Sequence, residues 1–384
     1  MISYGKQDIR VEDIEFVIDV LKSDFLTQGP IVPKFEEALS NATGAKYVTA
    51  VNSATSALHL ACLALDIQPG EVVWTVPNTF VASANCALYC GAKIDFVDID
   101  PQTSNMSVDL LHAKLRKAEQ TGQLPVVVIP VHLTGEPCDM AAIKKLSQEY
   151  NFKIIEDASH AIGGKYQGRP IGCCEYSDIT VFSFHPVKIV TSGEGGAALT
   201  NCSDLDQKLK LLRSHGITRD QAQMEYPSDD GWYYEQIDLG YNYRMTDIHA
   251  ALGLSQLTRL NEYVEKRQLI AARYDQEFMG SNLQTPYRNP TNKSASHLYV
   301  IQVEPSRHKY IFNNLRKRKI GVNLHYIPVH TQPYYQKLGF TWGDFSNSED
   351  YYKKAISLPM FPTLTEDEQT FVIEAVKKLC DDHE

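Results

Sequence analysis

Short apolar runs alternate with amphipathic helical patterns through the first two-thirds of the chain. Segments of helical spacing or helix-forming composition lie at residues 53–67, 80–91, 107–119, 139–150 and 204–216. Between them, apolar runs of strand length occupy residues 71–76, 94–99, 126–132, 152–156, 179–184 and 196–199. This alternation predicts an α/β fold of three layers (αβα), in which helices cover both faces of a mostly parallel sheet. Ligands of such sheets bind beyond the carboxyl ends of the strands.

The last third of the chain has a different pattern. A helical pattern runs almost unbroken from Met245 to about Met279, which is long for a globular helix and suits a bridge between two domains. A smaller α+β domain is indicated by strand-like and helix-like segments that alternate at residues 297–304, 307–319, 322–329 and 365–379. We therefore expect a large domain at residues 1–250, with an N-terminal helical segment, and a small domain at residues 251–384 that begins in the bridging helix.

Composition and charge narrow the range of partners. The 384 residues are 43% hydrophobic, and the net charge of −10 argues against a large nucleic-acid surface but permits a local anion site. No apolar run approaches the roughly 20 residues that cross a bilayer, and the N-terminus lacks the features of a secretory signal. The eight cysteines show no paired C-x-x-C spacing, which is typical of reduced thiols. We expect a cytoplasmic protein that binds no nucleic acid, membrane or metal.

One candidate anion site is the stretch NSATS at residues 52–56, where the strand-like YVTAV passes into an apolar helix. Unpaired amides at a helix start, small side chains and two hydroxyl groups can together surround a phosphate. Taken alone, hydroxyl residues before a helix are more often simple N-caps. Residues 52–56 therefore indicate a phosphate site only in combination with other residues.

A second group of candidates is formed by Asp157 and Lys188. Asp157 ends a buried strand, and Lys188 follows 31 residues later in FSFHPVKIVTSGEGG, where apolar neighbours would lower its pKa by desolvation. Considered one at a time, each residue has a simpler structural role: Asp157 can form a salt bridge, and Lys188 can lie at the surface. When Ser183 and the NSATS stretch are considered as well, one cofactor, pyridoxal phosphate, explains all of these residues. Its aldehyde can react with a lysine, its pyridine nitrogen can pair with an aspartate, and its phosphate can bind hydroxyl groups and amides. The glycines after Lys188 would let the chain turn sharply into the next strand.

These residues lie in stretches that resemble the DegT/DnrJ/EryC1/StrS family of sugar aminotransferases over nearly the whole chain. The resemblance implies the type I fold of the pyridoxal-phosphate-dependent aspartate aminotransferases. Seven ordered stretches carry the resemblance: LTQGPIVPKFE, VNSATSALHLA, PNTFVASANCAL, EDASHAIG, SFHPVK with GEGG, GYNYRMTDIHAALG and HYIPVHTQPYY.

The resemblance implies a role for each candidate residue. Lys188 would form the Schiff base with pyridoxal phosphate, Asp157 would face the pyridine nitrogen, and His160 takes the place of a glutamine beside the ring hydroxyl in many relatives. The remaining cofactor contacts would be the stacking Phe80 and the phosphate contacts Ala54, Thr55, Ser183 and, from the neighbouring subunit of a homodimer with shared sites, Asn242. The segments that line the sugar-nucleotide side in relatives would contribute Gln28, Tyr326 and His330.

The stretch SFHPVK followed by TSGEGG most resembles a subgroup that aminates a nucleotide sugar of the pseudaminic acid route. That subgroup transfers the amino group of L-glutamate to C4 of a UDP-linked 4-keto-6-deoxy-N-acetylhexosamine. Dehydratase members of the family carry histidine at the position of Lys188, so the lysine favours transamination.

Two other functions stay open on the sequence, and a third is rejected. Another nucleotide-sugar 4- or 3-aminotransferase shares most of the motifs, and a non-catalytic binding or regulatory protein can share the fold. An NAD-dependent oxidoreductase is suggested by the glycines of GEGGAA, but they precede a strand-like run instead of joining a strand to a helix.

Overall fold

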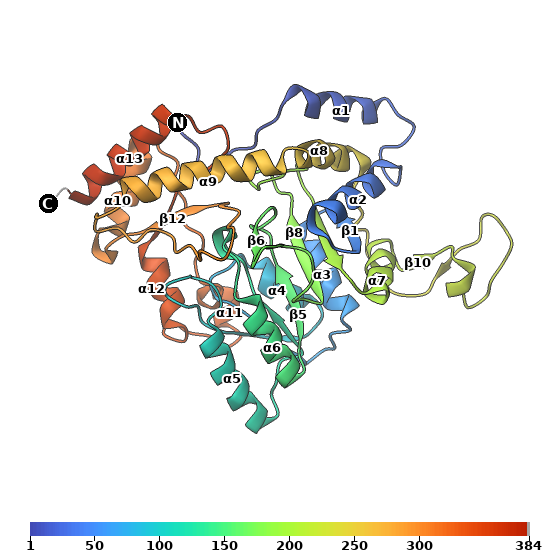
Figure 1. Ribbon diagram of the computed structural model, residues 1–384. Coiled ribbons are helices and arrows are strands. Elements are labelled where there is room, and N and C mark those ends of the chain that lie inside the picture. The colour runs from blue at the N-terminus through green and yellow to red at the C-terminus, as the bar shows by residue number, and fades with distance from the viewer. Residues whose placement is uncertain (382–384) are drawn as a thin grey trace.

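The computed structural model describes residues 1–381 and is built around a seven-stranded sheet with the order β1-β9-β8-β5-β4-β2-β3 (Figure 1). Every neighbouring pair is parallel except the two that contain β9, which runs antiparallel to β1 and to β8. The predicted, mostly parallel sheet is therefore confirmed. Its strands are β1 (Tyr47–Val51), β2 (Val72–Thr75), β3 (Lys93–Phe96), β4 (Val127–Ile129), β5 (Lys153–Asp157), β8 (Ile179–Ser183) and β9 (Gly196–Thr200).

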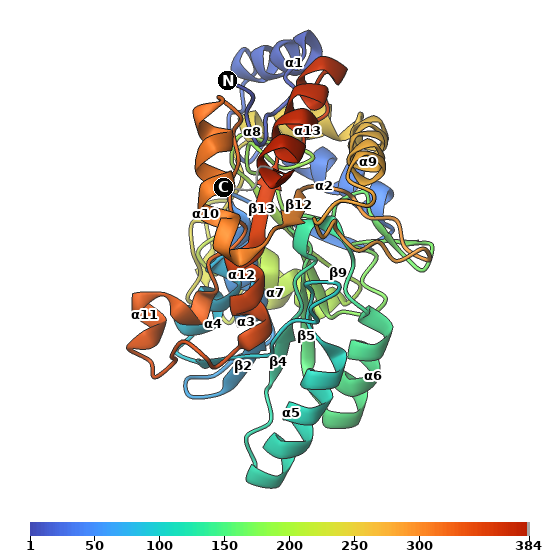
Figure 2. The ribbon, with the colours of Figure 1, turned by 90° about the vertical axis from the view of Figure 1, so that its left-hand side faces the viewer.

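Helices cover both faces of this sheet, as the alternating pattern predicts (Figure 2). One face carries α3 (Ala54–Ala64), α4 (Ala82–Tyr89) and α7 (Ser203–Arg213), which share a hydrophobic core with it. The other face carries α2 (Ile31–Thr43), α5 (Val108–Thr121) and α6 (Met140–Tyr150), which contribute to a second core. Helix α3 is apolar on nearly all sides and is almost wholly buried, as expected for a helix enclosed by other elements.

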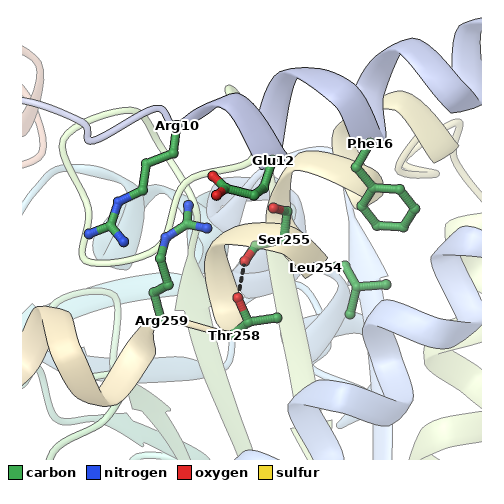
Figure 3. A pocket seen from close by; sticks show the side chains of 7 residues that line it. All are labelled: Arg10, Glu12, Phe16, Leu254, Ser255, Thr258 and Arg259. Carbon is green, nitrogen blue, oxygen red and sulfur yellow. Dashed lines mark hydrogen bonds between the residues drawn. The ribbon is translucent and has the colours of Figure 1, made fainter.

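The long helical pattern forms two helices, α8 (Asp247–Leu257) and α9 (Leu260–Glu277), so the prediction of one continuous helix is wrong. A local hydrogen bond and a long-range ion pair both occur at the break. Thr258 Oγ1 donates to the carbonyl of Ser255 at 2.6 Å (Figure 3), and the Arg259 backbone leaves the helical region with ψ at 11°. The Arg259 guanidinium is held by both carboxylate oxygens of Asp13, at 2.7 and 2.6 Å. The two helices still run in succession across the top of the molecule (Figure 1).

The C-terminal part has a core of its own, which draws on residues from Ile270 in α9 to Leu379. The predicted boundary at residues 250 and 251 falls inside α8, which packs on α1 (Val11–Leu21) and α2. The C-terminal elements are the antiparallel strands β12 (Tyr299–Gln302) and β13 (Ala355–Leu358) with the helices α10 (Pro305–Lys317), α11 (Pro333–Gln336), α12 (Ser346–Lys354) and α13 (Glu366–Asp381).

Residues 322–329, predicted as a strand, form an irregular connection, so that prediction is also wrong. Only an isolated bridge between Asn323 and Ser357 pairs this segment with β13. Two of its amides bond to side chains instead: Leu324 donates to the Asn323 carboxamide oxygen, and Tyr326 donates to that of Asn78. Local side-chain acceptors compete with sheet pairing in this way, and Pro328 has no amide to contribute.

Two short hairpins complete the fold: β6 (Lys165–Tyr166) with β7 (Arg169–Pro170), and β10 (Ile217–Thr218) with β11 (Glu235–Gln236). The second hairpin belongs to an arm, residues 214–243, that projects from the body of the molecule beyond α7 (Figure 1). Within residues 1–381, no helix has the length and apolar character needed to cross a membrane.

Candidate active site

A cavity of about 400 Å³ lies at the carboxyl ends of β5 and β8, where ligands of α/β sheets bind. Its lining also includes the start of α3 and the irregular segment that contains Tyr326. Eight of the side chains predicted from the sequence come together here: Ala54, Thr55, Phe80, Asp157, His160, Ser183, Tyr326 and Lys188. They come from segments more than 270 residues apart in the chain.

The start of α3 forms an anion cradle on one side of the cavity. Ser53 is the N-cap, and its hydroxyl accepts the amide of Ser56 at 3.1 Å. Gly196 at the start of β9 packs so closely that a Cβ there would lie 2.4 Å from the Ala54 nitrogen, so only glycine fits. The first-turn amides of a helix have no partner within the helix, and they attract a phosphate group. Thr55 and Ser183 add hydroxyl groups to this end of the cavity.

Lys188 enters the cavity from the turn after β8. Burial of the amine lowers the pKa of Lys188 to about 8, and the nearby charge of Asp157 acts in the opposite direction. A lysine with such a pKa has a substantial neutral fraction near neutrality, and the neutral amine is the form that attacks a carbonyl carbon. Gly193, with φ at +80°, lets the chain turn back toward β9 after the lysine.

Asp157 is the last residue of β5 and is only 4% exposed. Its Oδ2 accepts the Ser83 hydroxyl at 2.6 Å, and its Oδ1 accepts the Ser159 amide at 3.1 Å. The preceding Glu156 points to the opposite face of the sheet, as alternation along a strand requires, and bonds to His132 at 2.7 Å. Of these two adjacent carboxylates, only Asp157 lines the cavity.

His160 lies beside Asp157 and is held by Tyr326, whose hydroxyl is 3.2 Å from Nε2 of the imidazole. The other ring nitrogen, Nδ1, is buried and has no partner among the described residues. Burial, together with the nearby charge of Lys188, keeps the pKa of His160 well below its usual value. His160 therefore presents a neutral ring whose unpaired nitrogen is available to a ligand.

Three predicted residues lie outside this cavity. Gln28 is exposed beside the start of α2, where the Asp247 carboxylate accepts the amides of Gly29, Ile31 and Val32. Asn242 is exposed at the base of the projecting arm. His330 is fully buried, with Nε2 3.0 Å from Glu349, and its position does not support the predicted contact with a substrate.

The polar residues of the cavity that were not predicted include Thr79, Ser83, His185, His297 and His325. Thr79 and Ser83 are four residues apart in TFVAS, a spacing that places side chains on one side of a helical turn and was the available signal. His297 and His325 come from the C-terminal part. His325 opens the HYIPVHTQPYY stretch that contains Tyr326, so the stretch was the available signal, whereas nothing in the local sequence marks His297. Burial lowers the pKa of His325 to about 4, so this ring is neutral as well.

A second hollow, of about 420 Å³, lies between α1 and α8 and contains two arginines (Figure 3). Both guanidinium groups are paired, Arg10 with Glu262 at 2.6 Å and Arg259 with Asp13 at 2.6 Å. Their charges are thus already neutralised, and this hollow does not compete with the cavity at the sheet as a catalytic site. Among residues 1–381, no group of three His, Cys, Asp or Glu side chains could hold a metal ion.

Comparison with proteins of known sequence finds relatives that match nearly the whole chain. The chain is 39% identical to the spore coat polysaccharide biosynthesis protein SpsC of Bacillus subtilis, over 98% of this chain and 96% of that protein. It is 38% identical to the UDP-4-amino-4,6-dideoxy-N-acetyl-beta-L-altrosamine transaminase of Campylobacter jejuni (serotype O:23/36), over 98% of this chain and 99% of that protein.

Solved structures of sugar aminotransferases also match nearly the whole chain. PseC of Helicobacter pylori, an aminotransferase of pseudaminic acid biosynthesis, is 31% identical and superposes with a TM-score of 0.90 over 99% of both chains. The PLP form of Spr1654, a sugar aminotransferase from Streptococcus pneumoniae, is 30% identical, with a TM-score of 0.89 over 99% of this chain and 98% of that one. The sequence model of the DegT/DnrJ/EryC1/StrS aminotransferases matches residues 7–377. The chain belongs to the DegT/DnrJ/EryC1/StrS aminotransferase family.

Proposed function

We propose that this family member transfers the amino group of L-glutamate to the C4 ketone of a UDP-linked 2-acetamido-2,6-dideoxy-4-hexulose. The products would be UDP-4-amino-4,6-dideoxy-N-acetyl-beta-L-altrosamine and 2-oxoglutarate. The observation that carries the proposal is the meeting of Lys188 and Asp157 in one cavity beside an anion cradle. The choice of sugar is supported by the Campylobacter relative, which is named as a transaminase of this amino sugar, and by PseC of Helicobacter pylori, which is named as an aminotransferase of pseudaminic acid biosynthesis.

The cavity fits pyridoxal phosphate at each of its functional groups. The Lys188 amine suits the aldehyde, the amides and hydroxyls at the start of α3 suit the phosphate, and Asp157 suits a protonated ring nitrogen. The unpaired Nδ1 of His160 supplies a partner for the ring hydroxyl. Phe80 lies at the cavity mouth with 57% of its surface exposed, where a flat ring could stack on it. When bound, pyridoxal phosphate supplies an aldehyde carbon that carries the amino group and a ring that accepts electrons from the adjacent carbon.

The residues of this chain would act by binding and by moving protons. Lys188 Nζ would take a proton from Cα of glutamate, hold it as an ammonium and release it within the cavity, and it would serve in the reverse sense when the sugar binds. A pKa of about 8 suits both roles, since the amine can gain or lose a proton near neutral pH. Asp157 would keep a proton on the ring nitrogen through a charge-assisted hydrogen bond, which strengthens in a dry site.

The proposed assembly is a homodimer in which Asn242 of the partner subunit reaches the phosphate. Asn242 is exposed on the arm and does not line the cavity of its own chain, which is the placement that a shared site requires. Tyr326 would contact the sugar substrate from inside the cavity, whereas Gln28, being exposed, would reach a substrate only at the subunit boundary. We place the enzyme in the cytoplasm because all eight cysteines are free thiols.

The test is to incubate purified protein with glutamate and a panel of nucleotide-linked 4-keto sugars, and to identify the aminated product by NMR. Amination at C4 of the UDP-linked N-acetylhexosamine is expected. Amination at C3, or preference for another nucleotide sugar, would refute the proposed substrate. A protein without cofactor absorbance and without activity on any amino donor would refute the enzymatic function altogether.

A further inference from the structure

Two buried hydroxyl groups are hydrogen-bonded in series to the carboxylate of Asp157. Ser83 Oγ lies 2.6 Å from Asp157 Oδ2, and Thr79 Oγ1 lies 2.8 Å from Ser83 Oγ. Both hydroxyl residues are 1% exposed. They belong to the turn that opens α4, on the face of the sheet opposite α5 and α6. Asp157 is thus connected to a helix from a different part of the chain.

The chemistry of the groups fixes the direction of these hydrogen bonds. An ionised carboxylate can only accept, and a hydroxyl group has a single proton to donate. Ser83 must therefore donate to Asp157, which leaves Thr79 to donate to Ser83. Hydrogen bonds arranged in such a chain polarise and strengthen one another in a medium of low dielectric constant.

These two hydrogen bonds restrain the terminal torsion of the Asp157 side chain, which otherwise rotates easily. The terminal torsion of an aspartate side chain has a broad energy profile, so the plane of the carboxylate is set by its partners. The Ser159 amide holds Oδ1 from the end of β5, and Ser83 holds Oδ2 from α4. The Ser83 amide bonds to the Phe80 carbonyl at 3.2 Å, so the turn that aims this hydroxyl also places Phe80 at the cavity mouth.

We propose that Ser83, oriented by Thr79, is a positioning residue that fixes the plane of the Asp157 carboxylate toward a cationic ring nitrogen bound in the cavity. The inference rests on the proposed function and deepens it. The alternative role for Ser83 is structural only: a buried hydrogen bond that ties α4 to β5 and contributes to stability whether or not a ligand is present.

The decisive comparison uses Ser83→Ala, the conservative variant Ser83→Thr, and Thr79→Val, which keeps the Ser83 hydroxyl but removes its donor. Thr75→Val is the matched control, because the buried Thr75 hydroxyl donates to the Ile129 carbonyl and has no contact with Asp157. The readouts are the affinity of cofactor-free protein for pyridoxal phosphate, the pH dependence of the visible absorption of the bound cofactor, and kcat and KM for glutamate.

Ser83→Ala is expected to lower kcat and cofactor affinity by about tenfold to a hundredfold, the range for loss of one hydrogen bond to a charged group, with KM for glutamate little changed. The pH at which the cofactor absorption changes should shift in the same variant. Ser83→Thr should restore most of both properties, and Thr79→Val should show the same changes at a smaller size. Thr75→Val should lower thermal stability without altering absorption or kinetics.

The proposal is overturned if Ser83→Ala loses thermal stability like Thr75→Val while its cofactor affinity, absorption profile and kcat remain those of the wild type. If Ser83→Ala does not fold, wild-type kinetics and absorption in Thr79→Val overturn it equally. A wild-type protein that never develops cofactor absorption would instead refute the proposed function, so the two failures are distinguishable.

Discussion

Asp157 at the end of β5 and Lys188 in the turn after the neighbouring strand β8 face one cavity, and the aspartate charge opposes the burial that lowers the pKa of Lys188 to about 8. The lysine must be neutral to attack an aldehyde and protonated to return a proton. The balance between burial and this one carboxylate therefore sets the pH range of the site.

The pH dependence of cofactor capture should follow this balance. Cofactor-free protein should react with pyridoxal phosphate at a rate that rises with pH and is half-maximal near pH 8, where half of the Lys188 amines are neutral. Asp157→Asn removes the charge that raises the pKa, so the midpoint should move to lower pH. The measurement is the rate of change of visible absorption across a pH series. Asp204→Asn, at an exposed position, is the control and should leave the midpoint unchanged. A midpoint that stays in place or rises in Asp157→Asn contradicts the assigned interaction.

Replacement of the lysine should separate chemistry from folding. Lys188→Ala should lose all detectable amino transfer and the visible absorption of the purified protein, while the fold, monitored by circular dichroism, persists. Lys46→Ala removes an exposed lysine before β1 and should behave as wild type. Borohydride reduction followed by peptide mapping should place the cofactor on Lys188 in the wild type. A label on another lysine, or transamination by Lys188→Ala, would exclude the assigned role.

Three buried imidazoles around the cavity make stability depend on pH. Burial lowers the pKa values of His160, His297 and His325, the last to about 4, so these rings are neutral in the folded protein. The unfolded chain binds their protons below its ordinary histidine pKa of about 6.5, so the free energy of unfolding should fall with falling pH from there, by up to about 1.4 kcal/mol per pH unit for each ring.

His132 affects stability in the opposite direction, and it does so over a different pH range. Its pKa is raised to about 10, because the interactions with Cys138 and Glu156 outweigh burial, so its stabilisation is complete below about pH 6.5 and is lost as the pH rises toward 10. Between about pH 5 and 6.5 the slope includes the contribution of the three neutral rings, and a single substitution isolates the share of one ring. Urea unfolding of cofactor-free protein should show a slope that His297→Gln reduces by about one proton. An unaltered slope in His297→Gln would mean that this ring is already protonated in the folded state.

A shared active site predicts complementation between two inactive variants. Lys188→Ala lacks the amine in its own cavity, and Asn242→Ala lacks the phosphate contact that we propose it gives to its partner. In a hybrid dimer one site combines both defects and the other has neither. Refolding the two variants together should therefore restore activity to about a quarter of the wild-type value, since half of the dimers are hybrids with one intact site.

The matched control for this experiment is a mixture of Lys188→Ala with Asp157→Ala. Both defects lie in the same cavity, so each site of a hybrid dimer keeps one of them and no activity should return. Recovery in the control, or none in the test mixture, would contradict the proposed exchange of Asn242 between subunits.

Much of the fold followed from local patterns because each of them depends on neighbours within a few residues. Alternation of apolar runs and helical periodicity predicted the central strands and their covering helices, and the pattern failed where a tertiary contact intervened. The continuous helix is broken where Arg259 turns to bind Asp13, and residues 322–329 leave sheet pairing where Asn78 accepts the Tyr326 amide. Neither partner lies near these segments in the sequence.

In the site, too, some features followed from the sequence and others only from the tertiary structure. The sequence by itself singled out Lys188, Asp157 and the NSATS stretch as parts of one site, because the order of strand, turn and helix dictates which loops meet at the carboxyl edge of a parallel sheet. Only the tertiary structure decided that Tyr326 binds His160, that Ser83 holds Asp157, and that His330 is buried against Glu349. These pairs are separated by 19 to 166 residues, and a hydrogen bond across such a separation depends on how whole elements pack.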